Sequence, residues 1–155
     1  MALKADRQID SVELRYFLNE VASAGKVLVV STAGSGVAMD SIVNLATVSA
    51  SSSGGKPLGM LINDFVSIDL TRQHVNYHKD EQVVGDKCTI VRKGWLVTDA
   101  ITGTPAAGDH AVLSSSGTVT NLAPGGTWNE ALNPKVGRFV TKKDESGYAT
   151  VYIDL

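Results

Sequence analysis

The chain has 155 residues, with 14 Lys and Arg, 16 Asp and Glu and a formal net charge of −2. A single domain of this length buries enough apolar surface to fold without a metal or a disulfide. Nucleic-acid-binding proteins carry an excess or a stripe of basic residues, which this sequence lacks, so we expect no nucleic-acid partner. The 15 Gly and the low charged fraction of 19% are typical of a turn-rich β protein.

The single Cys88 excludes an intrachain disulfide and any zinc site built on several cysteines. It lies in the apolar run 88–91, so we expect it to be a small core residue. The polar N-terminus lacks the apolar segment of a secretory signal, and no run approaches the ~18 apolar residues of a membrane span. We therefore expect a soluble protein made in a reducing cytoplasm, with no membrane partner.

The N-terminal region, residues 1–25, is expected to form an arm and a helix. Residues 2–9 show no packing pattern and predict a free arm. Residues 10–24 predict a helix, because apolar residues recur there at helical spacing, namely Leu14, Phe17, Leu18 and Val21. Asp10 and Glu13 resemble a capping box, and Gly25 is a plausible helix end. Leu14 and Phe17 then either pack on the protein's own body or contact another subunit.

From residue 26 onward the sequence predicts strands, bounded by turn residues. We expect them at 26–31, 44–50, 58–62, 66–70, 88–92, 94–98, 110–114, 117–121, 136–142 and 148–154. The last is the clearest, because apolar and polar side chains alternate along it. The predicted fold is therefore mainly β: residues 26–155 form a small β-barrel or sandwich of repeated hairpins, which follows the N-terminal arm and helix.

Two internal similarities favour repeated hairpins. Pro57-Leu58-Gly59-Met60-Leu61-Ile62 resembles Lys135-Val136-Gly137-Arg138-Phe139-Val140, and each places a Gly where a bulge or a close backbone approach is expected. The strands predicted next, 66–70 and 151–155, both end in Ile-Asp-Leu. In the second similarity, Gly85-Asp86 precedes Gly94 at the spacing with which Gly108-Asp109 precedes Gly117. Gly94 and Gly117 are expected to turn one strand into the next.

No constellation of residues predicts catalysis. His74 and His78 stand four apart before Asp80-Glu81 and could share a metal on a helix, but a zinc site needs three or four ligands and a solvated polar surface explains them as well. Gly54-Gly55-Lys56 lacks the upstream Gly of a phosphate loop, and Pro57 stands where that loop requires Ser or Thr. We therefore predict that the protein is not an enzyme and has no catalytic residues, no cofactor and no metal.

The two tryptophans differ in context. Trp95 follows Gly94 in an apolar run and is expected in the core. Trp128 lies in the loop Pro124-Gly125-Gly126-Thr127-Trp128-Asn129, where an aromatic side chain either packs on its own loop or anchors an interface.

Taken together, three segments resemble a tailed-bacteriophage head protein: Pro57-Leu58-Gly59-Met60-Leu61, Val84-Gly85-Asp86-Lys87-Cys88-Thr89-Ile90-Val91-Arg92-Lys93-Gly94 and Val136-Gly137-Arg138-Phe139-Val140. The chain is similar to small capsid decoration (cement) proteins, including the class with a β-rich body like that of the lambda head-stabilising protein. The resemblance covers most of residues 26–155. It implies a structural protein that binds the outer surface of an expanded icosahedral head and stabilises that shell against internal genome pressure.

The resemblance implies two kinds of partner, the major capsid protein and further copies of the chain itself. We expect a homotrimer first and a dimer second. A free edge strand or the arm could add to a capsid strand, and we expect Leu3, Arg7 and Ile9 to contact the capsid. Another phage structural component, such as a tail, adaptor or baseplate β module, is the alternative function. An enzyme with an unrecognised site around His74 or His78 ranks third.

Overall fold

The computed structural model describes residues 3–31, 44–67, 81–127 and 129–155. Within them, the only helical segment is a 3-10 turn at Ser115–Gly117, so the prediction of a mainly β protein is confirmed. The strands are β1 (Leu3–Glu13), β2 (Phe17–Leu18), β3 (Val27–Val30), β4 (Leu45–Val48), β5 (Pro57–Leu61), β6 (Asp64–Val66), β7 (Glu81–Val83), β8 (Ile90–Thr98), β9 (Ile101–Thr102), β10 (His110–Leu113), β11 (Val119–Leu122), β12 (Lys135–Phe139) and β13 (Ala149–Asp154).

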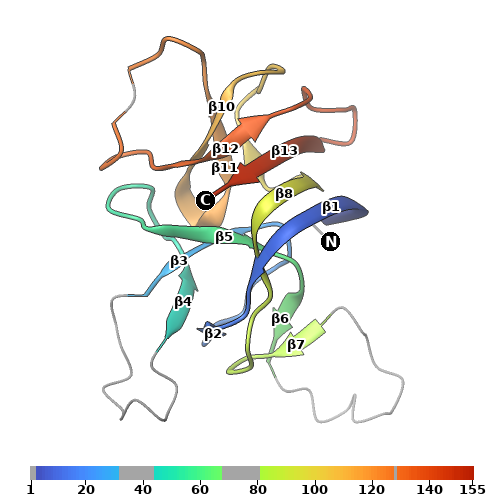
Figure 1. Ribbon diagram of the computed structural model, residues 1–155, viewed down its shortest axis with the longest axis vertical. Helices are drawn as coiled ribbons and strands as arrows, with labels where there is room; N and C mark the ends of the chain where they lie inside the picture. The colour runs from blue at the N-terminus through green and yellow to red at the C-terminus, as the bar shows by residue number, and fades with distance from the viewer. Residues whose placement is uncertain (1–2, 32–43, 68–80, 128) are drawn as a thin grey trace.

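One large mixed sheet joins eleven of these strands (Figure 1). Its order is β2-β4-β3-β5-β8-β13-β12-β10-β11-β9, and β1 pairs with β8 outside this path. β6 and β7 form a separate parallel pair. The prediction of a closed barrel is not confirmed, because the two terminal strands of the order, β2 and β9, pair with β4 and β11 and not with each other.

The prediction of an N-terminal helix is wrong, and so is that of a free arm at residues 3–9. Leu3–Glu13 is an eleven-residue strand that runs antiparallel to β8, and Phe17–Leu18 pairs with Leu45 and Ala46. The four apolar residues at helical spacing do not form one buried face. Only Leu18 is fully buried, whereas Leu14 and Val21 are 51% and 63% exposed. An isolated helix of this length is marginal in water without a buried face, so strand pairing prevails.

Two predicted strands, 88–92 and 94–98, are a single strand, β8. Gly94 lies inside it and does not form a turn, contrary to expectation. A Cβ at Gly94 would lie 2.3 Å from the carbonyl oxygen of Gln8, so glycine is needed there for β1 to approach. Gly117, by contrast, does lie in the turn between β10 and β11. The predicted strand 66–70 shares only Val66 with β6, and its residues 68–70 lie outside the described part of the chain. The other predicted strands are present with shifted ends.

The large sheet contains the same order of pairings twice. We call β1–β5 with the start of β8 the N-terminal unit, and β8–β13 the C-terminal unit. In the N-terminal unit, β2 is parallel to β4, β4 pairs with β3, β3 with β5, and β5 with β8. In the C-terminal unit, β9 is parallel to β11, β11 pairs with β10, β10 with β12, and β12 with β13. β8 therefore belongs to both units.

Residue positions match between the units as well as strands. Glu13 and Leu96, Leu18 and Ile101, and Gly25 and Gly108 are each 83 residues apart. Gly25 N–H donates to the Leu61 carbonyl at 2.8 Å, and Gly108 N–H donates to the Phe139 carbonyl at the same distance. Likewise, Ser31 N–H donates to the Leu45 carbonyl at 2.9 Å, and Ser114 N–H donates to the Thr118 carbonyl at 2.8 Å. The protein is thus built from two similar β units.

The matched glycines Gly59 and Gly137 confirm the similarity of 57–62 with 135–140. The match of the next strands, 66–70 with 151–155, is wrong, because β12 pairs with β13 where β5 pairs with β8, so β13 corresponds to the start of β8. The pairing of β3 with β5 skips Leu58, and the pairing of β10 with β12 skips Val136, so each strand has a bulge just before its glycine. A Cβ at Gly59 would lie 2.2 Å from the Val91 carbonyl oxygen. A Cβ at Gly137 would lie 1.8 Å from the Tyr152 carbonyl oxygen. Both glycines therefore permit a close backbone approach.

The strands β10–β13 of the C-terminal unit lie above β2–β5 of the N-terminal unit in Figure 1, and the core clusters indicate that the two units stack in the same orientation. One face of the N-terminal unit, which we call its inner face, packs against Phe65 of β6. Together they form one core cluster of buried residues: Leu18, Ala22, Leu28, Ala46, Leu61, Phe65, Cys88 and Ile90. The matching inner residues of the C-terminal unit, Ile101, Ala111, Val119, Phe139 and Val151, belong to the second cluster. That cluster also contains Val27, Met60 and Val91, from the opposite face of the N-terminal unit. The inner face of the second unit thus covers the outer face of the first.

Candidate functional site

The long strand β1 is the most exposed regular element of the described structure. All of its residues except the terminal Leu3 and Glu13 are exposed to solvent. Among the described strands it pairs only with β8, so its other edge carries unpaired backbone donors and acceptors. A strand edge of this kind is a template for adding a strand from another chain. This open edge is the candidate site.

Apolar side chains accompany the open edge. Ile9 and Val12 of β1 are 39% and 43% exposed, and Leu14, just after the strand, is 51% exposed. Lys and Arg alternate with Asp along the rest of the strand. Main-chain pairing supplies affinity and side chains at alternate positions supply specificity when a strand is added to a sheet. Ile9 and Val12 are therefore the side chains through which β1 can select a partner.

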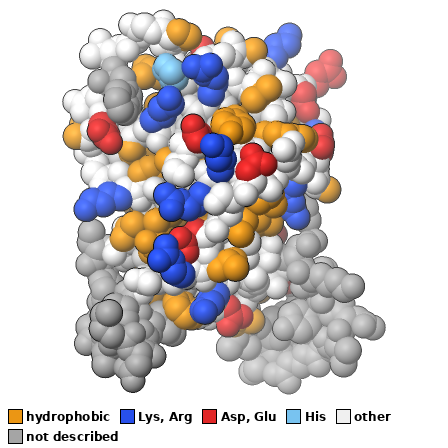
Figure 2. Space-filling model, in the orientation of Figure 1, with side chains coloured by type: hydrophobic (Ala, Val, Ile, Leu, Met, Phe, Trp, Pro, Cys, Tyr) orange, Lys and Arg blue, Asp and Glu red, His pale blue; other side chains and the backbone are white. Residues whose placement is uncertain are grey.

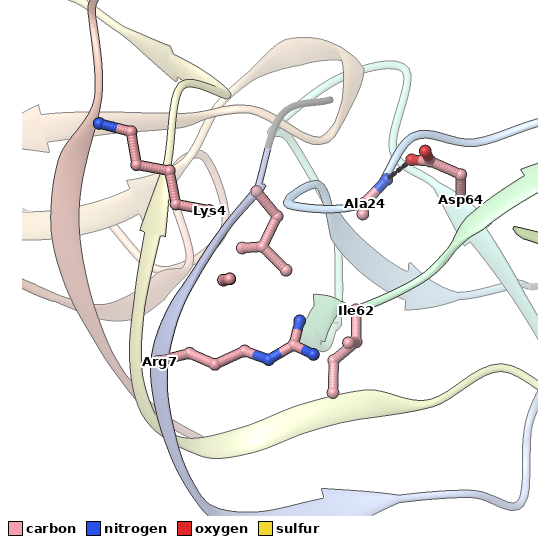
Figure 3. A pocket seen from close by; sticks show the side chains of 7 residues that line it. Lys4, Arg7, Ala24, Ile62 and Asp64 are labelled. Carbon is pink, nitrogen blue, oxygen red and sulfur yellow. Dashed lines mark hydrogen bonds between the residues drawn. The ribbon is translucent and has the colours of Figure 1, made fainter. Parts of the chain in front are cut away.

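A small cavity of about 100 Å³ lies under the start of β1 (Figure 3). Its lining includes Leu3, Arg7, Ile62 and Asp64. Arg7 extends from β1 toward Ile62, and Asp64 accepts a hydrogen bond from the Ala24 N–H at 2.6 Å (Figure 3). None of the ion pairs found among the described residues includes Arg7, so its guanidinium is available to a carboxylate of a partner.

The three residues predicted to contact a capsid differ in exposure. Arg7 and Ile9 are exposed on β1. Leu3 is only 4% exposed and belongs to the core cluster between the two units, so it anchors β1 instead of facing a partner. The contact therefore remains a prediction for Arg7 and Ile9.

The three residues predicted at an interface are also separated. Leu14 is exposed just beyond β1, close in sequence to Val12. Phe17 is half-buried in β2, and the Lys87 ammonium lies 5.7 Å from the centre of its ring. Trp128 falls outside the described residues, as do His74 and His78.

Cys88 and Asp109, two side chains that could carry chemistry, are engaged in structural contacts. Cys88 is fully buried, its Sγ lies 3.2 Å from the Tyr16 carbonyl oxygen, and burial raises the pKa of its thiol to about 11. The Asp109 carboxylate accepts hydrogen bonds from the Ala106 N–H and the Asn121 side chain, which lower its pKa. No group of three or more His, Cys, Asp or Glu side chains that could hold a metal occurs in the described part of the chain.

Glu13 shows how β1 ends. Its carboxylate accepts hydrogen bonds from the Leu14 and Arg15 N–H groups and from the Arg15 guanidinium, at 2.8–3.1 Å. The Arg15 hydrogen bonds lower the pKa of Glu13 to about 2. The feature that resembled a helical capping box is thus a side chain that satisfies the backbone where the strand turns.

Comparison with known proteins identifies no relative: no protein-family model matches the chain, and no curated protein matches it. No helix in the described ranges is long and apolar enough to cross a membrane.

Sequence reasoning missed the strand character of residues 3–13 and the surface position of Trp95. Trp95 was expected in the core, but it is half-buried, and its indole Nε1–H donates to the Gln8 side chain at 3.1 Å. The signal for an edge strand was available in the alternating charged residues of 4–10, which suit a strand exposed on both faces better than a free arm.

Proposed function

We propose that the protein is a structural virion component that binds the outer surface of an icosahedral bacteriophage head and stabilises the expanded shell. Its partner is the major capsid protein. The proposal rests on the sequence resemblance to capsid decoration proteins, and the open edge of β1 is the structural observation that supports it. A role in binding, without catalysis, agrees with an exposed strand mounted on a doubly stacked β body.

Attachment would occur by strand addition. The free edge of β1 pairs with an edge strand of the capsid protein, while Ile9 and Val12 pack on it and Arg7 pairs with a carboxylate. Each such contact can be weak, because a decoration protein that is itself a trimer or a dimer binds neighbouring capsid subunits at once. Linked sites raise the overall affinity through effective concentration. Closed cyclic oligomers also suit the symmetry axes of a shell.

The test is binding to shells from the phage that encodes the chain, after the native copies of this protein are removed. Wild type and the Ile9→Lys variant are sedimented with these shells, and the bound fraction is measured across a concentration series. A lysine on an edge strand opposes strand addition. Because Ile9 is 39% exposed, the variant should fold normally, and its affinity should fall by about tenfold or more.

Leu132→Lys is the matched control, since Leu132 is an equally apolar, 51% exposed residue in the segment between β11 and β12. It should bind as wild type does. Equal binding of all three proteins would contradict attachment through β1. Binding of wild type to tails but not to heads would instead favour the alternative of a tail, adaptor or baseplate component.

A further inference from the structure

The outer face of the C-terminal unit carries a row of directly opposed side chains that crosses six strands. The register pairs Gln8 of β1 with Trp95, Trp95 with Tyr152, Tyr152 with Arg138, Arg138 with His110, and His110 with Leu122. Directly opposed residues of paired strands lie on one face of the sheet. We call these six residues the cross-strand row. Trp95, Tyr152, His110 and Leu122 are half-buried, and Arg138 and Gln8 are exposed.

The N-terminal unit shows what this face can do, because its matching face is already an interface. The residues that correspond to His110, Arg138 and Tyr152 are Val27, Met60 and Val91. All three are fully buried, since the inner face of the C-terminal unit covers them. The cross-strand row is therefore the position where a further layer would stack, and no described residue covers it. Phe65 and β6 close the opposite end of the stack.

Trp95 and Gln8 of this row bond to one another, but polar groups of Arg138, Tyr152 and His110 lack partners among the described residues. No ion pair or hydrogen bond includes the Arg138 guanidinium or the Tyr152 hydroxyl, and His110 Nδ1 is buried without a hydrogen-bond partner. The charges of the neighbouring Lys93 and Asp154 offset one another, because Lys93 Nζ lies 3.7 Å from Asp154 Oδ1. At the end of the row, Gln8 Nε2–H donates to the Asp10 carboxylate at 3.2 Å, and Arg138 is the charged member of the row that has no ion pair among the described residues. In Figure 2, hydrophobic side chains are interspersed with Lys and Arg, and with Asp and Glu, over the part of the molecule where Figure 1 places β8, β12 and β13.

We propose that the cross-strand row is a docking surface for an acidic, apolar segment of a partner protein. A partner carboxylate pairs with Arg138 in the two-pronged geometry that suits guanidinium. An apolar partner side chain packs on Trp95 and Tyr152. Trp, Tyr and Arg are the residues that most often carry the binding energy of protein interfaces. This surface is a sheet face, separate from the open edge of β1, so it provides a second contact beyond the proposed attachment.

A second copy of the chain fits this face poorly. Face-to-face pairing through a twofold axis brings each cross-strand row against its own symmetry mate. Where the axis passes near Arg138, its guanidinium would oppose that of the second copy with no carboxylate from the row to compensate it, which opposes association. A partner carboxylate can pair with the exposed Arg138 guanidinium, and charge complementarity therefore favours an acidic partner.

The experiment uses the full chain labelled with ¹⁵N and the synthetic peptide acetyl-Leu-Glu-Leu-Glu-Leu-amide. Binding is followed by NMR from the indole N–H of Trp95, assigned with the Trp95→Phe variant. The peptide in which Gln replaces both Glu is the first comparison. We expect the Glu peptide to shift the Trp95 signal and the Gln peptide to bind about tenfold more weakly. Arg138→Gln should abolish this preference, so that both peptides bind equally weakly.

Lys56→Gln is the matched control, because it removes one exposed lysine from the N-terminal unit and changes net charge equally. It should keep the wild-type preference for the Glu peptide. Failure of the Glu peptide to shift the Trp95 signal would overturn the proposal. So would a preference that survives in Arg138→Gln or disappears in Lys56→Gln. Cellohexaose is the last arm: a Trp95 shift with this sugar and none with the peptide would assign the face to carbohydrate instead.

Discussion

The N-terminal and C-terminal units share their strand order and their bulged glycines but differ in what covers them. On the outer face of the N-terminal unit, Val27, Met60 and Val91 are buried against the other unit. On the same face of the C-terminal unit the matching residues include Arg138 and Tyr152. The backbone pairings are alike in both cases. Stacking, and not strand pairing, therefore decides whether these positions are apolar or polar.

The inner faces of the two units, unlike the outer faces, carry similar residues. Leu18 matches Ile101, Leu61 matches Phe139, and Ile90 matches Val151, and all six are buried. Each inner face lies over a neighbouring layer, which is β6 for the N-terminal unit and the N-terminal unit itself for the C-terminal one. Positions with the same surroundings in both units have kept the same apolar character.

Exchanging residues between the units gives the largest expected effect. Met60→Arg introduces into the N-terminal unit the residue that the C-terminal unit has at this position. Because Met60 is fully buried between the units, the arginine would bury an unpaired charge and lower the free energy of unfolding by roughly 4 kcal/mol or more. The reciprocal Arg138→Met, at an exposed position, should change it by less than about 0.5 kcal/mol. Urea unfolding followed by tryptophan fluorescence measures both, and similar effects of the two exchanges would disprove the stacking.

The bulged glycines give the next largest effect. Gly137→Ala would place a Cβ 1.8 Å from the Tyr152 carbonyl oxygen, so β12 and β13 must separate. We expect a loss of roughly 3 kcal/mol of stability. Gly125→Ala is the control: its φ of 86° disfavours alanine, but no atom of the described residues would lie within 4 Å of the added Cβ, so the loss should be about 1 kcal/mol. Thermal unfolding ranks the two variants, and a smaller loss at Gly137 would contradict the close approach.

Cys88 sharpens the comparison of the inner faces, because its counterpart on β13 is the buried Ala149. Burial raises the pKa of the Cys88 thiol from 9.0 to about 11. At pH 8 the native protein should therefore resist Ellman's reagent, while the protein in urea reacts fully. Since the folded pKa lies above the unfolded one, this residue's stabilisation is complete below pH 9 and is lost as the pH rises through 11. Rapid reaction of the native thiol would contradict its core position.

Glu13 gives the smallest effect. Its counterpart Leu96 is buried and apolar, whereas Glu13 bonds to Arg15, whose side chain is 77% exposed. The Arg15 hydrogen bonds lower the pKa of Glu13 from 4.5 to about 2, so its stabilisation is present above pH 4.5 and is lost as the pH falls toward 2. Solvent screens an exposed pair, which keeps the effect small. Glu13→Gln should unfold with less pH dependence between 4.5 and 2 than wild type; an unchanged profile would argue against the pair.

Much of the fold could be predicted from local pattern. Most strands after residue 26 follow from alternation and turn residues, and the glycine bulges follow from the similarity of 57–62 with 135–140. The N-terminal helix could not be corrected from sequence, because Phe17 and Leu18 become strand residues only through pairing with β4, which is distant in the chain. The stacking could not be predicted either, because the positions of Met60 and Arg138 are equivalent in strand pairing and differ only in whether another layer covers them.

The candidate site was less accessible to prediction than the fold. Arg7 and Ile9 were singled out on the expectation of an arm, and they lie exposed on a strand. The cross-strand row was missed entirely, because its six residues come from six strands and become neighbours only through the register of the sheet. No spacing along the sequence joins Trp95, Tyr152, Arg138 and His110.

The proposed role in a phage head is best tested by quantitative mass spectrometry of virions purified from cultures that produce the protein. The copy number of the protein is compared with that of the major capsid protein. We expect a near-stoichiometric ratio, because a decoration protein covers the whole shell. A ratio of a few per cent would contradict decoration of the shell and favour a tail or vertex component, and absence from virions would contradict the structural role altogether.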